Sequence, residues 1–265
     1  MISAMAKGAQ VLDDPRYAEA AGRAADFVLS EMTEGDLLLR THRGGRSKLN
    51  AYLDDYAFLA SGLLDLYETT FDLRWLREAK RLMLVLIEYF WDGHEGGFYF
   101  TGKNHEPLLT RSRSGIDGAI PSGNAVAAGA LLRLGVLTGE EVFRQKGVEL
   151  LRAFRAVMEK APSGLARFLA ALDFYLDTPR EVAVVGPPGA EETRGLLREV
   201  HRRYLPNRVL ALLDPAESAE AVGKEVPLLA GKTQLNGRTT AYVCENYTCQ
   251  APTHDLNQFV RLLEE

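Results

Sequence analysis

The sequence lacks several features that would assign the protein to a class at once. It has only two cysteines in 265 residues, so a disulfide-rich secreted scaffold is excluded. Its longest apolar runs, such as residues 82–87, are far shorter than the ~20 residues of a membrane span. The first ten residues contain no basic stretch followed by an apolar core, so no secretory signal is predicted. We therefore expect a cytoplasmic protein without a membrane partner.

The chain also has no excess of positive charge. Its 31 Lys and Arg residues are outnumbered by 36 Asp and Glu residues, and the formal net charge is −5. This balance argues against nucleic acid as a partner. A hydrophobic share of 46% and a charged share of 25% are ordinary for a folded globular protein and exclude general disorder. Composition thus excludes several classes and names no function.

A repeated pattern occupies the first two thirds of the chain. Tyr17, Trp75 and Phe143 each stand near the start of an amphipathic helix that follows a turn signal. Each of these helices is preceded by a helix rich in Ala and Gly. We expect these Ala- and Gly-rich helices at residues 2–12, 56–70 and 123–137, and a fourth at 165–176. Small residues allow close helix contact, so we interpret the Ala- and Gly-rich helices as inner and the more charged ones as outer.

The connections alternate between short turns and long polar loops. The long loops, near residues 33–55 and 92–122, contain short strand-like runs at 37–40 and 98–100. This alternation predicts a mainly α fold over residues 1–178, a partial (α/α)6 toroid of about three and a half hairpins. Its functional face would be the long-loop face, because loops on a rigid scaffold carry sites. An incomplete ring would favour self-association or pairing with a missing N-terminal half.

The pattern changes in residues 179–265, where we predict a small α/β appendage. Strands are expected at 181–185, 207–213 and 239–244, and helices at 191–203 and 255–263. The first strand, helix and strand form a βαβ unit of a small parallel sheet. Residues 186–189, GPPG, match neither common nucleotide-binding loop, so a structural turn is favoured over an anion site at the helix start.

Several stretches resemble one protein family. They are LDDYAFLASGLLDLYE, FWDGHEGGFYFT, DGAIPSGNAVAA, EVAVVG and GRTTAYVCENYTCQAPTHD. Together they resemble the C-terminal half of the spermatogenesis-associated protein 20 family, whose bacterial members are the thioredoxin-domain-containing YyaL-type proteins. The resemblance implies a thioredoxin-like domain upstream and an (α/α)6 toroid similar to N-acylglucosamine 2-epimerases and six-hairpin glycosidases. It carries over no firmly assigned reaction, and the family's redox cysteines would belong to the absent domain.

Asp54, Asp55 and Tyr56 are the first candidate site residues. Carboxylates at a helix start can simply cap it and favour its dipole. Alternatively, one of the two can point into the ring as a general acid or base, or hydrogen-bond sugar hydroxyls. In this interpretation Asp54 and Asp55 are catalytic and Tyr56 contacts the substrate.

The next inner helix begins with a comparable set. Asp117 is a candidate catalytic carboxylate, and Ser122, Gly123 and Asn124 are candidate substrate-binding residues. A capping role for Ser122 and a close approach at Gly123 are the structural alternative. Two helix starts with Asp and polar residues at equivalent positions are the main sequence evidence for a site.

The long loop and the C-terminal cysteines supply the remaining candidates. Trp91 and His94 are predicted to contact a substrate, although an aromatic cluster more commonly packs a hairpin. Cys244 and Cys249 have a C-x4-C spacing. A structural role is favoured for them, followed by a reversible disulfide and then a metal site. We predict no metal and no cofactor.

These observations favour a carbohydrate-related domain that binds or acts on a small sugar, with epimerase or glycoside hydrolase chemistry if it is an enzyme. The alternative is a non-catalytic scaffold or partner-binding fragment of a larger thioredoxin-domain-containing protein. Redox sensing by the two cysteines is a third hypothesis.

Overall fold

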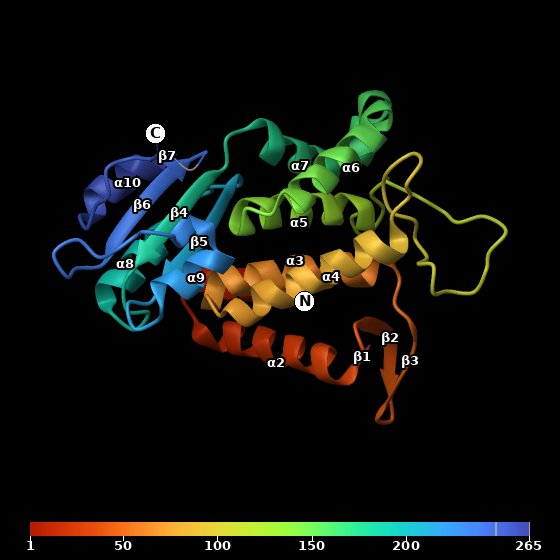
Figure 1. Cartoon of the computed structure of the whole chain (residues 1–265), viewed down its shortest axis with the longest axis horizontal. Coiled ribbons are helices and arrows are strands. Elements are labelled where there is room, and N and C mark those ends of the chain that lie inside the picture. Colours follow the sequence, from red (N-terminus) through yellow and green to blue (C-terminus); the bar gives the residue numbers. More distant parts are fainter. Residues whose placement is uncertain (247, 265) are drawn as a thin grey trace.

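The computed structural model describes residues 1–246 and 248–264. Helices dominate the first part of the chain, and a small sheet with flanking helices forms the last part (Figure 1). The first part is built from antiparallel hairpins. They are α1 (Ile2–Leu12) with α2 (Pro15–Glu31), α3 (Leu53–Thr70) with α4 (Leu73–Phe90), and α5 (Gly123–Thr138) with α6 (Glu141–Lys160), after which α7 (Ala166–Leu176) follows.

Each hairpin turns through a residue with a left-handed backbone. These residues are Asp13, Phe71 and Gly139, with φ of 53°, 60° and 66°. Two of the following helices are capped by the next aspartate: Asp14 accepts from the backbone of Arg16, and Asp72 does the same for α4. The short turns are therefore fixed by local chemistry that is visible in the sequence.

The Ala- and Gly-rich helices lie side by side. Helix α3 packs between α1 and α5, and α5 packs against α7. Side chains of α3 and α5 are buried on almost every side, whereas α2, α4 and α6 bury a single stripe each. This arrangement of inner and outer helices confirms a mainly α fold, in which part of an α/α toroid precedes an α/β segment.

The long connections meet at one end of the helices, at the right of Figure 1. The first folds into an antiparallel sheet of β1 (Thr33–Glu34), β2 (Leu37–Arg43) and β3 (Arg46–Asn50). The strand expected at 37–40 is therefore part of a longer hairpin. The strand-like run at 98–100 forms only an isolated bridge between Trp91 and Phe98.

The α/β segment lies at the other end of the helices, at the left of Figure 1. Its elements are β4 (Arg180–Val185), α8 (Glu191–Arg202), β5 (Arg208–Leu213), α9 (Ala219–Glu225), β6 (Thr240–Glu245), β7 (Thr248–Cys249) and α10 (Leu256–Glu264). Strand β4 pairs parallel to β5, which confirms the βαβ unit. It pairs antiparallel to β6, so the expectation of a parallel sheet is wrong at this strand. The chain enters β6 from a tight turn at Asn236 and Gly237, both with positive φ, and this turn reverses its direction.

The two faces of this sheet pack against different partners. Ala183, Val185 and Ala211 belong to the same core as the helical hairpins. Val182 and Leu210, on the opposite face, pack with the side chains of α8 and α10. The α/β segment therefore covers the short-turn end of the inner helices and shares their core.

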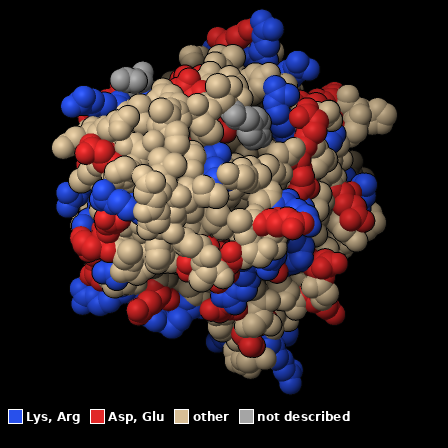
Figure 2. Space-filling view, turned by 60° about the vertical axis from the view of Figure 1, so that its left-hand side comes forward, with Lys and Arg blue, Asp and Glu red and all other residues tan. Residues whose placement is uncertain are grey.

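Figure 2, with the α/β segment turned toward the reader, shows Lys and Arg interspersed with Asp and Glu around an area without charged groups. Neither sign of charge forms a continuous patch on this face. Within residues 1–246 and 248–264, no helix is long and apolar enough to cross a membrane.

Candidate functional site

The predicted residues Asp54 and Asp55 lie in the first turn of α3, because this helix begins at Leu53, earlier than the sequence pattern suggests. The Asp55 carboxylate accepts a hydrogen bond from the backbone N–H of Tyr52 at 2.8 Å. It also forms an ion pair of 2.8 Å with Arg40 of β2. Asp55 thus caps the start of its own helix and connects it by an ion pair to the β2–β3 hairpin.

Asp54 joins the starts of two inner helices. Its half-buried carboxylate accepts a hydrogen bond from the backbone N–H of Gly123. A Cβ at Gly123 would overlap Oδ1 of Asp54 and lie 2.8 Å from Cγ of Leu53, so only glycine permits this approach. Burial raises the pKa of Asp54, and the charge of Asp55 raises it further. Of the predicted site residues, Asp54, Asp55 and Gly123 are therefore brought together.

Asp117 joins the starts of the next two inner helices. Its Oδ1 accepts from the backbone N–H of Ser122 at 2.9 Å, and its Oδ2 accepts from the backbone N–H of Arg167 at 2.8 Å. Ser122 in turn caps α5 by accepting from the backbone of Ala125. Asp117 and Ser122 form a second polar group at this end of the helices.

Tyr56 and Asn124 are buried, at 1% and 0% exposure, and hold long connections in place. The Tyr56 hydroxyl accepts from the backbone N–H of Leu38 at 2.8 Å. The amide of Asn124 accepts from the N–H of Phe98 and donates to the carbonyls of Phe98 and Ser114. The polar atoms of both predicted substrate-contacting side chains are thus hydrogen-bonded to backbone groups in this structure.

Trp91 and His94 lie at the end of α4 and in the loop that follows it. The Trp91 ring packs edge-on against Phe98, and the Lys146 ammonium lies 4.2 Å from its centroid. His94 is exposed, and its backbone N–H donates to the carboxylate of Asp92. Both residues stabilise the loop after α4.

A cavity of about 750 Å³ lies on the inner side of the arc formed by α1, α3, α5 and α7. It extends from Pro121 at the long-loop end to Arg208 of β5 and His201 of α8. The middle of its lining comes from positions within the inner helices, including Phe58 and Arg133. The volume lies within the range of small-molecule sites.

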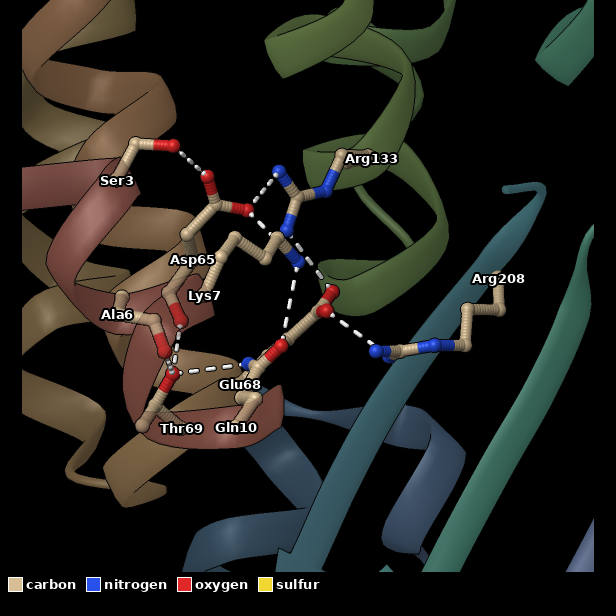
Figure 3. A network of polar contacts seen from close by, with 9 residues as sticks. All are labelled: Ser3, Ala6, Lys7, Gln10, Asp65, Glu68, Thr69, Arg133 and Arg208. Atoms are coloured by element: carbon tan, nitrogen blue, oxygen red, sulfur yellow. Dashed lines mark hydrogen bonds and ion pairs between the residues drawn. The ribbon is translucent and has the colours of Figure 1, made fainter. Parts of the chain in front are cut away.

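A network of charged side chains (Figure 3) lines this cavity. Arg133 of α5 pairs with Asp65 and with Glu68 of α3, at 3.0 Å each. Arg208 of β5 reaches the second oxygen of Glu68 at 3.2 Å. From α1, Lys7 approaches Asp65 at 3.4 Å, so the network connects elements from both parts of the chain.

The two carboxylates of the network, Asp65 and Glu68, are charged in spite of their burial. Burial raises the pKa of Asp65, but the charges of Arg133 and Lys7 outweigh it and leave the pKa below its ordinary value. The pKa of Glu68 is likewise raised by burial and lowered more strongly by Arg133 and Arg208. Both side chains are thus hydrogen-bond acceptors at neutral pH and have no proton to donate.

His201 brings an imidazole to the cavity wall. Burial, assisted by the charges of Arg208 and Lys7, lowers its pKa to about 3. Its buried Nε2 atom has no hydrogen-bond partner within residues 1–246 and 248–264. A neutral imidazole of this kind can bind a polar ligand group, but it is a weak base.

Sequence reasoning missed these cavity residues, although a signal was present. Asp65 interrupts the apolar run SGLLDLY, and Arg133 interrupts GALLRLG. Burial of a charged residue in the middle of an apolar helix face costs folding free energy unless the charge is paired. Asp65 and Arg133 therefore stand out from polar residues at helix starts, which are ordinary.

The two cysteines are joined by a disulfide between opposed positions of β6 and β7. Cys244 is buried in the core, and Cys249 is exposed. Within the described part of the chain, no group of three His, Cys, Asp or Glu side chains is placed to hold a metal ion.

Comparisons with known proteins place this chain among named relatives. No protein-family model matches it. Spermatogenesis-associated protein 20 from Rattus norvegicus is 33% identical over 276 residues, which cover 100% of this chain and 35% of the relative. The Homo sapiens protein of the same name is 33% identical over 274 residues, which cover 99% of this chain and 35% of the relative. The chain thus spans about a third of the length of these curated relatives.

Among solved structures, cellobiose 2-epimerase from Spirochaeta thermophila is similar with a TM-score of 0.45 and 21% sequence identity. The similar region covers 58% of this chain and 41% of the epimerase.

Proposed function

This chain belongs to the spermatogenesis-associated protein 20 family, and we propose that it binds a small carbohydrate in its concave cavity. The observation that carries the proposal is the set of ionised, fixed side chains in the cavity, Asp65, Glu68 and Arg133, in reach of the partly exposed ring of Phe58. Sugar hydroxyls both donate and accept, so carboxylates and guanidinium groups bind them together, and a sugar face stacks on an aromatic ring.

The charge state of the cavity favours binding over glycoside hydrolysis. A glycosidase needs one carboxyl group with a raised pKa as general acid, and the pKa values of Asp65 and Glu68 are both lowered. Asp54 has a raised pKa, but it lies at the start of α3 and is not among the cavity-lining residues. His201 is too weak a base for epimerisation by proton abstraction at neutral pH. The function proposed from these residues is therefore recognition of a sugar.

Phe58 offers the clearest test, because it is 36% exposed and is not part of the ionic network. Calorimetric titration of the 265-residue chain with glucose, N-acetylglucosamine, mannose and cellobiose should identify at least one ligand. The variant Phe58→Ala should bind that sugar roughly tenfold more weakly. The matched control is Phe27→Ala, since Phe27 is 45% exposed on the outer helix α2 and lies outside the cavity.

Two outcomes would refute the proposal. One is the absence of binding for every sugar, and the other is the same loss of affinity in both phenylalanine variants. Unchanged binding in Phe27→Ala, together with weakened binding in Phe58→Ala, would support it.

Exposed apolar side chains favour a second candidate, a partner-binding role without catalysis. Val11 and Leu12 of α1 are 64% and 61% exposed, and Tyr204 after α8 is 91% exposed. Val11 and Tyr204 both line the mouth of the same cavity, and contiguous apolar surface commonly marks an interface. Sedimentation velocity over a hundredfold range of protein concentration should then show association that Tyr204→Ser weakens, and a concentration-independent monomer would exclude self-association.

A further inference from the structure

The charges that line the cavity do not balance. Within the described residues, its lining includes five cationic side chains and three carboxylates. Two of these carboxylates, Asp65 and Glu68, are already matched by Lys7, Arg133 and Arg208. The net charge of the cavity lining therefore depends on the two remaining cations, Arg167 and Arg203, and on the third carboxylate.

Arg203 and Arg167 differ in whether their guanidinium groups have an ion-pair partner. Arg203 is paired with Glu199 and Glu264, which do not line the cavity. The guanidinium of Arg167 has no acceptor among the described residues, although its backbone N–H is bound by Asp117. The third lining carboxylate, Asp173, accepts a hydrogen bond from Asn207. Asn207 is neutral, so Asp173 keeps its charge, and apart from Arg203 four lining cations face three carboxylates. Among the described residues, Arg167 is the lining cation whose guanidinium has no ion pair.

The position of Arg167 is fixed by its neighbours. It lies in the first turn of α7, and its guanidinium rests against α5 at Gly129, where an added Cβ would be 3.5 Å from Nη2. Burial lowers its pKa and the positive charge of Arg133 lowers it further, and these effects outweigh the opposing charges of Asp65 and Asp117. Two guanidinium groups line the same cavity, and only that of Arg133 is in ion pairs with carboxylates, so the site is attractive for an anion at Arg167.

We infer that the sugar bound in this cavity carries an anionic group, a phosphate or a carboxylate, and that Arg167 binds that group. The inference rests on the proposed carbohydrate function and specifies its ligand class. A planar guanidinium with free N–H groups forms paired hydrogen bonds with either anion. The bound anion would reduce the repulsion between the positive charges of Arg167 and Arg133. The hydroxyl groups of the sugar would face Asp65 and Glu68, because these carboxylates repel anions and accept hydrogen bonds.

Titration calorimetry with four probes tests this inference on the 265-residue chain: glucose, glucose 6-phosphate, glucuronate and inorganic phosphate. At least one of the two anionic sugars should bind roughly tenfold more tightly than glucose. In Arg167→Gln this advantage should disappear while the affinity for glucose stays the same. The control is Arg152→Gln, because Arg152 is exposed on the outer helix α6 and outside the cavity.

A stability measurement separates ligand binding from a structural role of Arg167. Removal of an unmatched, partly buried charge should leave the urea midpoint of Arg167→Gln equal to or higher than that of the wild-type chain. A lower midpoint would assign Arg167 to stability and overturn the inference.

The remaining outcomes distinguish this inference from the proposed function. If glucose binds and neither anionic sugar binds more tightly, the anion subsite is refuted and the sugar site stands. If inorganic phosphate binds through Arg167 while all three sugars bind no better than phosphate, the anion site stands and the carbohydrate function fails. If no probe binds, both are refuted. The preferred anionic sugar, phosphate or uronate, identifies the natural charged group.

Discussion

The two ends of the inner helices use polar side chains in different ways. At the long-loop end, Asp54, Asp55, Asp117 and Ser122 bind backbone N–H groups of helix starts. Toward the α/β segment, Asp65 and Glu68 bind cationic side chains from other elements and accept no helix-capping bonds. The first group satisfies requirements of the fold, whereas the second carries a desolvation cost that the fold alone does not require. The comparison therefore supports the proposal that the second group, and not the first, binds a ligand.

Arg133 gives the largest expected effect. Arg133→Met leaves Asp65 and Glu68 with fewer cationic partners in a buried position, so the free energy of unfolding should fall by about 3–5 kcal/mol. Urea unfolding followed by circular dichroism measures the change. As a control, Arg155→Met removes an exposed ion pair with Glu159 and should leave the free energy of unfolding nearly unchanged. Equal losses in the two variants would show that the network is no more important than a surface pair.

Gly123 tests the other end of the helices. Gly123→Ala places a methyl group onto the Asp54 carboxylate and Leu53, and we expect a loss of about 1–3 kcal/mol in unfolding free energy. Gly129→Ala in the same helix meets only an ordinary contact with Arg167, and its higher helix propensity should stabilise the chain by up to about 1 kcal/mol. Thermal unfolding of both variants gives the comparison. A neutral Gly123→Ala would mean that the two helix starts approach less closely than described.

His201 makes the stability of the folded chain depend on pH. Its folded pKa of about 3 lies below the ordinary value of 6.5, so the unfolded chain binds the additional proton. The stabilisation is complete above pH 6.5 and is lost as the pH falls from 6.5 toward 3, by up to about 1.4 kcal/mol per pH unit. Asp65 and Glu68 add a loss only below about pH 4.5, where their unfolded forms take up protons.

Urea unfolding at pH 7, 6 and 5 therefore isolates the histidine. His201→Gln should flatten the dependence of stability on pH in this range, and the wild-type chain measured in parallel should keep the full slope. A steep dependence that persists in His201→Gln would contradict the assignment.

Local signals in the sequence explain how far the fold could be predicted. The range 2–12 agrees with α1, and the hairpin turns carry their own capping residues. Helix α9 was missed, because a helix of seven residues has too few turns for a periodic pattern. The orientation of β6 depended on a turn at Asn236 and Gly237 whose effect on the sheet is not local.

The cavity network could not be predicted from spacing, because its partners are distant in sequence. Arg133 and Asp65 are 68 residues apart, and Arg208 and Glu68 are 140 residues apart. Only the packing of α3 against α5, with the α/β segment placed over their ends, brings these charges together. The capping residues, by contrast, act on backbone close to them, so a short stretch of sequence is enough to indicate them.

Asp55 and Arg40 give the smallest expected effect and refine the account of the long-loop end. Asp55→Ala removes the hydrogen bond to the backbone of Tyr52 and should cost about 1 kcal/mol, as for other capping residues. Arg40→Gln removes only an ion pair between side chains that are 41% and 33% exposed, and it should cost a few tenths of a kcal/mol. A double-mutant cycle by urea unfolding separates the two contributions. A coupling energy above about 1 kcal/mol would show that the ion pair itself, and not the cap, fixes this helix start, so that Asp55 would resemble the buried carboxylates of the cavity.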